Sequence, residues 1–383
     1  MTDFGRQIMP RWHLDPALAN LNHGSFGACP KEVLEKQSAL RAYIERDSDT
    51  FFRHEIYPRC RRAADEIGAF INAPGSAIVF VPNTTTGVEA VLQSISWKKG
   101  DILVCANHSY NAVRQAVARQ MREHAIIVRA ADIALPMTDD GILSAYEVAM
   151  AGGERLMIVD HINSPLGCVW PVEKLIAMAR AKGAMVLVDG AHGIGQIDLD
   201  ISTMAPDWYV SNAHKWLLAP KGSAFLYAAP AVQAITHPPV VSIWFSEGYT
   251  SRFDYVGTND PTAHLVMPDA LAFTKSLGIA ATRAHRAKLM AHADAMFSTL
   301  KSRPAVSSSM RAAMGTWLLP KDSITQPEAA HGLMFWLREK HGVQVASHDH
   351  GDEIILRLSL QAYNGTEDID RVGAALREIG LGK

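Results

Sequence analysis

The sequence predicts an α/β fold in which a large, mostly parallel sheet is followed by a smaller C-terminal α+β domain. Between about residues 77 and 228, short runs rich in Val, Ile and Leu alternate with stretches of helical character. The runs lack polar alternation, which is typical of parallel strands that are buried on both faces. After about residue 230 the alternation stops, and a proline-containing region leads into a long helical stretch.

Six runs are predicted to form the strands of the large sheet. In chain order they are AIVFV (77–81), DILVCA (101–106), AIIVRA (125–130), LMIVDHI (156–162), AMVLVDG (184–190) and SAFLYA (223–228). Helices are expected between them, for example over 87–97 and over 171–183. The second of these helices begins near Pro171 and ends at Gly183, which is the usual placing of these two residue types at helix ends.

The change of pattern after the sixth run divides the chain. We expect an N-terminal segment over residues 1–30, a large domain over 31–265 and a small C-terminal domain over 266–383. A long helical region is predicted from about 268 to 302, and a mixed segment with the strand-like run EIILRLSL (353–360) follows.

Composition argues against several classes of protein. With 48% apolar and 20% charged residues, a chain of 383 residues can bury a substantial core and is not expected to be disordered. The formal net charge is -2 and no long basic run occurs, so no nucleic-acid partner is expected. No run resembles a membrane span or the apolar core of a signal peptide, so we expect a cytoplasmic protein without a membrane partner. The four cysteines form no Cys-x-x-Cys pair and suit reduced thiols.

The first motif with chemical content is PNTTTGVEAVL (82–92), which lies between a predicted strand and a predicted helix. Ligands of parallel α/β sheets bind beyond the carboxyl ends of the strands, and Thr85 and Thr86 follow such an end. Hydroxyl groups and backbone N–H groups at the start of a helix can bind phosphate. A threonine-rich helix cap without a ligand is the alternative, and it is preferred when this motif is taken alone.

The second motif is VLVDGAHGIGQ (186–196), in which Asp189 ends an apolar strand and His192 follows three residues later. A carboxylate at this position could pair with a cationic ring nitrogen. The motif is not a dinucleotide-binding loop, because no G-x-G-x-x-G occurs in it. A strand-ending aspartate in a glycine-rich turn, with no ligand, explains this motif equally well by itself.

The third motif, SNAHKWLLAPKGSAFLY (211–227), places Lys215 directly before the apolar residues Trp216 and Leu217. An ammonium group resists burial unless it is paired or loses its charge. Lys215 is therefore either a lysine whose ammonium reaches solvent at a strand end, or a buried amine with a lowered pKa that acts as a nucleophile. The second interpretation, with Asp189 at a strand end, resembles a site for pyridoxal 5'-phosphate (PLP), which needs a lysine, an acid beside its ring nitrogen and a phosphate cradle.

Seven segments in fixed order extend this likeness over nearly the whole chain. They are LNHGSFGACP (21–30), NTTTGVEAVL (83–92), NHSYNAVRQA (107–116), DGAHGIGQ (189–196), NAHKWLLAPKGSAFLY (212–227), DYVGTNDPTAHL (254–265) and LRLSLQAYNGTEDID (356–370). Together they resemble the class V aminotransferase family of PLP-dependent enzymes, which have fold type I. Within that family they resemble most the isopenicillin N epimerase-like branch.

The resemblance implies a role for the residues around the cofactor ring. Lys215 corresponds to the lysine that forms the Schiff base with the cofactor and moves the α-proton of the substrate. Asp189 corresponds to the partner of the pyridinium nitrogen, and His192 to a residue beside the 3'-oxygen of the ring. Tyr110 corresponds to the aromatic side chain that stacks on the ring, with His108 as the alternative.

The resemblance also implies a phosphate site that two subunits share. Thr85 and Thr86 correspond to the phosphate cradle, which Asn212 and His214 approach from the lysine segment. Thr258 corresponds to a residue that family members offer to the phosphate of the partner subunit. A homodimer with shared active sites is therefore implied.

A third group of matching residues concerns the substrate. Arg357 corresponds to the arginine that binds the substrate carboxylate, for which the planar guanidinium suits bidentate hydrogen bonding. Asn22 and His23 correspond to a loop that lines the substrate pocket. The N-terminal segment, residues 1–30, is therefore expected to line the active site.

Two features depart from the pattern of relatives. Cysteine desulfurases of this class carry a catalytic cysteine shortly before the arginine, whereas VQVASHDHGDE (343–353) contains none, so persulfide formation is not expected. Where many relatives have an asparagine near the 3'-oxygen, HINSPLG (161–167) has Ser164 at the aligned place and Asn163 beside it, and either can be the residue that reaches the ring. The acidic and histidine residues of 347–353 are interpreted as a solvated turn, and no metal is expected.

The resemblance points to epimerisation of an amino acid or an amino-acid conjugate after removal of its α-proton. A C–S β-lyase acting on a cysteine conjugate and an aminotransferase are the alternatives, and the sequence does not separate the three. A cofactor-binding regulator would need a DNA-binding segment, and none is visible. A nucleotide-binding α/β protein would need a phosphate loop of the G-x-x-x-x-G-K type, and none occurs.

Overall fold

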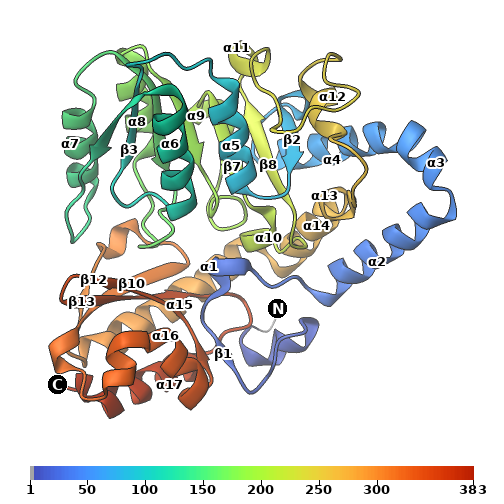
Figure 1. Cartoon of the computed structure of the whole chain (residues 1–383). Coiled ribbons are helices and arrows are strands. Elements are labelled where there is room, and N and C mark those ends of the chain that lie inside the picture. The colour runs from blue at the N-terminus through green and yellow to red at the C-terminus, as the bar shows by residue number, and fades with distance from the viewer. Residues whose placement is uncertain (1–3) are drawn as a thin grey trace.

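The computed structural model describes residues 4–383, and its largest element is a seven-stranded sheet (Figure 1). The strand order is β2-β8-β7-β6-β5-β3-β4. The bounds are β2 (Ile78–Val81), β3 (Ile102–Ala106), β4 (Ile127–Ala131), β5 (Glu154–Asp160), β6 (Met185–Asp189), β7 (Trp208–Ser211) and β8 (Ala224–Ala228). Only β8 runs antiparallel to its two neighbours, β2 and β7, so the prediction of a mostly parallel sheet is confirmed.

All six strands expected from the sequence are present, and their ends differ from the expected ones by at most two residues. Strand β7, with the sequence WYVS, was not expected. It is short, and its two aromatic residues give it no run of aliphatic side chains. This strand is the one that directly precedes the lysine segment, so the site depends on an element that the pattern of aliphatic residues does not reveal.

Helices cover both faces of the large sheet. Successive strand residues point to opposite sides, and the apolar side chains on each side pack against helices. Val79, Leu103 and Leu187 pack with α5, α6 and α12 on one face. Val104 and Val188 pack with α4, α7 and α8 on the other. The bounds of these helices are α4 (Ile56–Phe70), α5 (Thr84–Ser94), α6 (Asn111–His124), α7 (Asp139–Ala149), α8 (Val172–Ala181) and α12 (Tyr249–Asp254).

Shorter elements connect these layers. The N-terminal part contributes α1 (His23–Phe26), α2 (Lys31–Arg46) and α3 (Ser48–Thr50), and α2 and α3 extend away from the sheets at the right of Figure 1. The other connecting helices are α9 (Ile201–Met204), α10 (Ala213–Trp216), α11 (Pro230–Gln233) and α13 (Thr262–Leu265).

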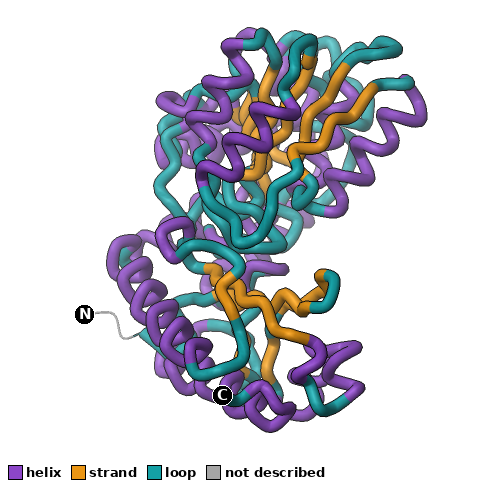
Figure 2. Tube along the Cα trace, turned by 90° about the vertical axis from the view of Figure 1, so that its left-hand side faces the viewer, coloured by secondary structure: helices purple, strands orange, loops and turns teal. Residues whose placement is uncertain are grey.

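A second, antiparallel sheet with the order β12-β13-β10-β9 lies below the large sheet in Figures 1 and 2. Its strands are β9 (Arg303–Pro304), β10 (Met314–Pro320), β12 (Ala346–His350) and β13 (Glu353–Ser359), and it shares a core with α15 (Ile279–Ser298), α16 (Pro327–His341) and α17 (Thr366–Leu376). The short strands β1 (Ala19–Asn20) and β11 (Val343–Gln344) pair in parallel, which joins the N-terminal segment to this part. The division at residues 30/31 and 265/266 stays a prediction.

One local expectation holds apart from a break in the helix, and another was wrong. The helical region expected over 268–302 consists of α14 (Met267–Leu277) and α15, because Gly278 interrupts it with a φ of 82° that favours glycine. The segment 347–353, expected as a turn, mostly belongs to β12. That strand is an edge strand paired with β13 alone, and the turn itself is limited to residues 351–352.

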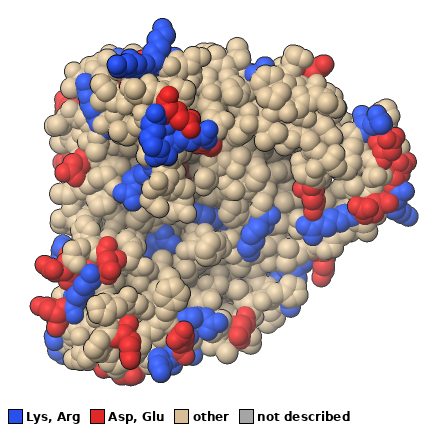
Figure 3. Space-filling model, viewed as in Figure 1, with Lys and Arg blue, Asp and Glu red and all other residues tan. Residues whose placement is uncertain are grey.

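No helix within residues 4–383 combines the length and the apolar character needed to cross a membrane. On the face shown in Figure 3, basic and acidic side chains are intermixed above, below and at the right, and mainly basic side chains lie along the middle.

Candidate active site

Lys215 lies on α10, a four-residue helix that follows β7 directly. Its side chain is buried, and its Nζ lies 3.1 Å from Nε2 of His192. Desolvation and the Arg357 guanidinium lower the pKa of Lys215 to about 7, although the Asp189 carboxylate opposes this shift. The structure therefore places Lys215 as a buried amine with a lowered pKa, and not as an ammonium that reaches solvent.

The hydrogen bonds of His192 define its tautomer. The indole Nε1–H of Trp216 donates to Nδ1 of His192 at 3.1 Å, so Nδ1 carries no proton. Burial, followed by the charges of Lys215 and Arg357, lowers the pKa of His192 well below its ordinary value, so the ring is neutral. Its one proton must then lie on Nε2, which faces Nζ of Lys215. A hydrogen bond between these two nitrogens requires a lone pair on Nζ, and therefore a neutral amine.

Two strand-ending carboxylates line the same cavity as Lys215. Asp189 ends β6 and Asp160 ends β5, and the two are paired in the parallel register. Desolvation raises the pKa of both groups, and the charge of Asp189 raises the pKa of Asp160 further. Oδ1 of Asp189 accepts a hydrogen bond from the backbone N–H of Ala191 at 3.0 Å, and Oδ2 of Asp160 accepts one from Ser109 Oγ at 3.3 Å. Sequence reasoning missed Asp160, although LMIVD ends in the same way as VLVD.

The start of α5 reaches this cavity too. Asn83 caps the helix, and its side chain accepts hydrogen bonds from both the N–H and the hydroxyl of Thr86, at 2.8 and 3.1 Å. Thr86 therefore serves the cap, and it is Thr84 and Thr85 that line the cavity. The N–H of Thr84 donates to Oδ1 of Asn212 at 2.9 Å, whereas its buried hydroxyl has no hydrogen-bond partner among the described residues.

Asn212 and His214, which follow β7, lie in the same cavity as the start of α5. Both line the cavity together with Lys215. Nδ1 of His214 donates to the carbonyl of Ser223 at 3.1 Å, and desolvation lowers the pKa of His214 to about 4, so its ring is neutral at pH 7.

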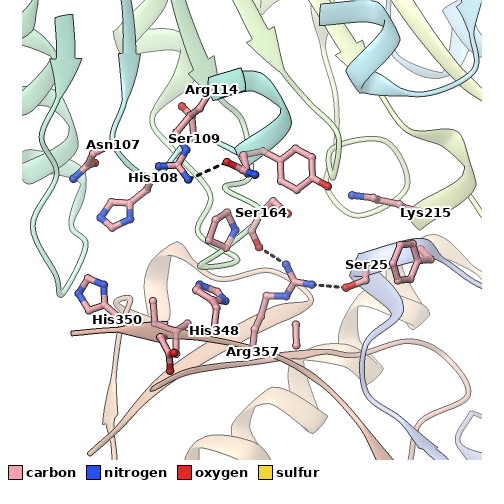
Figure 4. A pocket seen from close by; sticks show the side chains of 17 residues that line it. Ser25, Asn107, His108, Ser109, Arg114, Ser164, Lys215, His348, His350 and Arg357 are labelled. Carbon is pink, nitrogen blue, oxygen red and sulfur yellow. Dashed lines mark hydrogen bonds between the residues drawn. The ribbon is translucent and has the colours of Figure 1, made fainter. Parts of the chain in front are cut away.

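The cavity that holds Asp189, of about 300 Å³, adjoins a larger one of about 560 Å³ (Figure 4). Tyr110 and Ser164 line both cavities, as do Lys215, Ser25 and Phe26. Figure 4 shows Lys215 and Arg357 directed into this region from different parts of the fold.

Of the two neighbours Asn163 and Ser164, the serine lines the cavities. Asn163 is fully buried, and its Nδ2 donates to the carbonyl of His108 at 2.9 Å while its Oδ1 accepts from the N–H of Leu166 at 3.1 Å. The amide of Asn163 therefore holds two loops together.

Arg357, on β13, is 4% exposed, and its guanidinium lies between Ser25 and Ser164 in Figure 4. Nη2 donates to Ser25 Oγ at 3.1 Å and to Asn22 Oδ1 at 3.3 Å, and Nη1 donates to the carbonyl of Ser164. All of these partners are neutral, and Nε has no partner among the described residues. Desolvation lowers the pKa of Arg357 to about 10, so the group stays cationic at pH 7. The site thus holds a positioned cation that no carboxylate of residues 4–383 neutralises.

His23 does not lie where it was expected, whereas Thr258, which is expected to serve the partner subunit, lies away from the cavities of Lys215 in its own chain. His23 is buried, and its Nε2 donates to the carbonyl of Lys215 at 2.9 Å while its Nδ1 lies 3.0 Å from Tyr363 Oη. His23 therefore supports the backbone of the lysine and does not line the two cavities around its amine. Thr258 lies in a separate cavity with Arg53 and Tyr255, and its hydroxyl is 3.1 Å from Tyr255 Oη.

The donor set of the smaller cavity fits PLP. The Lys215 amine suits an aldehyde carbon, and the Asp189 carboxylate suits a cationic ring nitrogen. The unpartnered Thr84 hydroxyl at the start of α5 suits a phosphate oxygen. Within residues 4–383, no group of three or more His, Cys, Asp or Glu side chains is arranged to hold a metal. The four cysteines are buried, and none of them lines either cavity.

Comparison with known proteins adds three findings. Isopenicillin N epimerase of Streptomyces clavuligerus is 30% identical over 387 residues, which cover 96% of both chains. A protein of Arabidopsis thaliana with the name "Probable L-cysteine desulfhydrase, chloroplastic" is 30% identical over 398 residues, which cover 96% of this chain and 84% of that one. A cystine C–S lyase, solved with its product cysteine persulfide, has the same fold, with a TM-score of 0.83 at 20% identity over 95% of this chain and 98% of the other.

The family itself is shown by a match to the Aminotransferase class-V family over residues 29–372. The expectations of fold type I and of a relationship to isopenicillin N epimerase are confirmed. The chain belongs to the class V aminotransferase family, whose cofactor is pyridoxal 5'-phosphate.

Proposed function

We propose that this PLP-dependent enzyme removes the α-proton of an amino acid with Lys215, and that epimerisation is the outcome. The observation that carries the proposal is the 3.1 Å pairing of Lys215 Nζ with a neutral His192, in a region that also contains the unneutralised guanidinium of Arg357. When bound, PLP supplies an aldehyde carbon that a lysine amine attacks and a ring that withdraws electrons from the α-carbon of the substrate.

Each residue of the chain has a separate task in this proposal. Arg357 binds the α-carboxylate through charge-assisted hydrogen bonds and thereby orients the α-carbon. His192 favours the neutral form of the Lys215 amine, and when Nζ leaves this hydrogen bond its lone pair accepts the α-proton. Asp189 holds a proton on the ring nitrogen, which the cationic form of the ring requires.

C–S β-elimination is a second candidate, and one observation favours it. Elimination needs one base at the α-carbon, which Lys215 supplies, whereas epimerisation also needs a proton donor on the opposite face. The Arabidopsis relative is named as a desulfhydrase. Because no cysteine of the described residues lines either cavity, transfer of sulfur to the protein is not part of this proposal.

The test begins with the attachment site of the cofactor. Borohydride reduction of the holoenzyme followed by peptide mapping should place the pyridoxyl group on Lys215. Lys215→Arg should abolish exchange of the α-hydrogen of L-amino acids with D2O, whereas Lys221→Arg, a matched change in the same segment, should preserve it. Chiral analysis of the exchanged amino acid detects epimerisation, and assays for keto acid and sulfide detect elimination. An adduct on Lys221, or α-exchange that survives Lys215→Arg, would contradict the proposal.

We also propose that the enzyme is a homodimer in which Thr258 approaches the phosphate bound by the partner subunit. In support, Thr258 does not line the cavities that contain Lys215 in its own chain. It lines a different cavity, together with Arg53 and Tyr255. Sedimentation of the holoenzyme should give a dimer, and Thr258→Val should weaken PLP binding. A fully active monomer would contradict this arrangement.

A further inference from the structure

The larger cavity extends away from Lys215 and Arg357. We infer that this extension binds a second anionic group, which the side chain of the substrate carries. For convenience we call this extension, formed by Asn107, His108, Asn111, Arg114, His348, Asp349 and His350, the distal subsite. The inference rests on the proposed function and narrows its substrate class to amino acids with a negatively charged side chain.

Arg114 supplies the charge of the distal subsite. It projects from the first turn of α6, and Figure 4 shows it on the side of the cavity opposite Arg357. Its one side-chain hydrogen bond among the described residues is to the neutral Oδ1 of Asn111, at 3.3 Å. Two guanidinium groups, neither of them paired with a carboxylate of residues 4–383, therefore line one cavity. Two guanidinium groups without a carboxylate partner are suited to bind two separate carboxylates of one ligand.

Three imidazoles add hydrogen-bonding capacity without adding negative charge. His348 and His350 are two residues apart on β12 and so point to the same side of that strand. The ring of His350 lies 6.4 Å from that of His108, centroid to centroid. Nε2 of His108 donates to the carbonyl of Ile133 at 2.9 Å, which fixes that ring in place.

The one carboxylate in the distal subsite does not cancel this positive character. Asp349 pairs with Lys321, which lies outside the cavity lining, at 3.0 Å. Its charge is therefore offset by a residue that takes no part in the subsite. A cationic substrate side chain would instead face two guanidinium groups of like charge.

The volume of the cavity agrees with a substrate that has an extended side chain. About 560 Å³ lies within the range of pockets that hold ligands much larger than the amino and carboxyl groups of a single α-carbon. Lys215 and Arg357 account for the α-amino and α-carboxylate ends, so the remaining room is left for the side chain.

The experiment compares acids with their uncharged isosteres on the holoenzyme. L-aspartate, L-glutamate and L-2-aminoadipate are each titrated against the corresponding side-chain amide, with the absorbance change of the bound cofactor as the measure of binding. At least one acid should bind about 10- to 100-fold more tightly than its amide, as expected for a charge-assisted contact. Arg114→Gln should remove this preference, and Arg122→Gln, a matched change at an exposed position of the same helix, should retain it.

The outcomes separate this inference from the proposed function. If the amino acids change the cofactor absorbance and exchange their α-hydrogen, but acids and amides bind alike, the inference is overturned while the proposed function stands. The same holds if Arg114→Gln weakens acid and amide by the same factor. If no amino acid, charged or neutral, changes the absorbance or exchanges its α-hydrogen, the proposed function fails and the inference fails with it.

Discussion

Asp160 and Asp189 occupy paired positions at the ends of the parallel strands β5 and β6, so two buried carboxylates lie side by side. Burial raises the pKa of both, and the charge of Asp189 raises that of Asp160 further. A carboxyl group with a raised pKa binds its proton more tightly in the folded than in the unfolded state. The resulting destabilisation is absent below the ordinary carboxyl pKa of about 4 and grows as the pH rises through the raised value.

Asp160→Asn should therefore stabilise the cofactor-free protein at neutral pH. The variant keeps the shape of the side chain but removes one of two like charges, and we expect a gain of the order of 1 kcal/mol, or roughly 1–2 °C in melting temperature. The gain should shrink as the pH is lowered from 8 towards 4, and thermal unfolding across this range measures it. Asp352→Asn, in the exposed turn after β12, is the control and should change little. A uniform loss of stability at every pH would contradict the prediction.

The lowered pKa of Lys215 predicts how the cofactor-free protein takes up PLP. Only the neutral amine attacks an aldehyde, so the rate of covalent attachment should rise with pH through a midpoint near 7, well below that of an ordinary lysine. The growth of the absorbance of the lysine-bound cofactor, followed at a series of pH values, gives this midpoint. A midpoint near 10 would show that Lys215 is not desolvated in the cofactor-free protein.

Trp216→Phe should raise the same midpoint. The indole N–H holds Nδ1 of His192 free of a proton, at 3.1 Å, and so directs the imidazole proton towards Lys215. Without this donor the proton can move to Nδ1, and Nε2 can then accept a hydrogen bond from a charged ammonium. Trp97→Phe is the matched control, because the Trp97 indole donates to the carbonyl of Leu92, away from the site. Equal midpoints in both variants and the unchanged protein would refute the tautomer assignment.

Arg357→Leu should lower kcat/KM for α-carboxylate substrates by roughly 10²–10⁴-fold, since a bidentate charge-assisted contact is lost. The melting temperature should change little, because all hydrogen-bond partners of Arg357 among residues 4–383 are neutral and none of them is a carboxylate that would be left unpaired. Arg303→Leu, which removes a surface ion pair with Glu353 from the same sheet, is the control and should keep normal kinetics. A variant that unfolds, while its folded fraction turns over normally, would make Arg357 structural.

The sequence was informative wherever the evidence is local. Runs of aliphatic residues predict the six strands. A polar residue at the end of a buried run indicates the carboxyl ends of the strands, where Asp189 and Lys215 lie. Strand β7 escaped this reasoning because Trp208 and Tyr209 replace the aliphatic residues there. The break at Gly278 escaped it because a glycine within a helical pattern does not reveal its φ.

Contacts between distant segments could not be predicted in the same way. Asp160 lies at the site because the register between β5 and β6 places it beside Asp189. This register cannot be read from either segment alone. His23 is turned away from the cavities by Tyr363, a residue near the other end of the chain. The distal subsite combines α6 with the edge strand β12, and the sequence pattern of β12 alone suggested a solvated turn.

Strand β2 depends on a partner that is synthesised much later. It ends at Val81, yet its single neighbour in the sheet is β8, which ends at Ala228, and the start of α5 is tied to Asn212 through Thr84. Pairings between segments so far apart in the chain form slowly, because the intervening loop must first close. The phosphate recess can therefore not assemble on the ribosome before β8 has emerged. Capture of the vitamin-derived cofactor is consequently a late event in the biogenesis of this enzyme, and a nascent chain stalled before β8 should be unable to retain it.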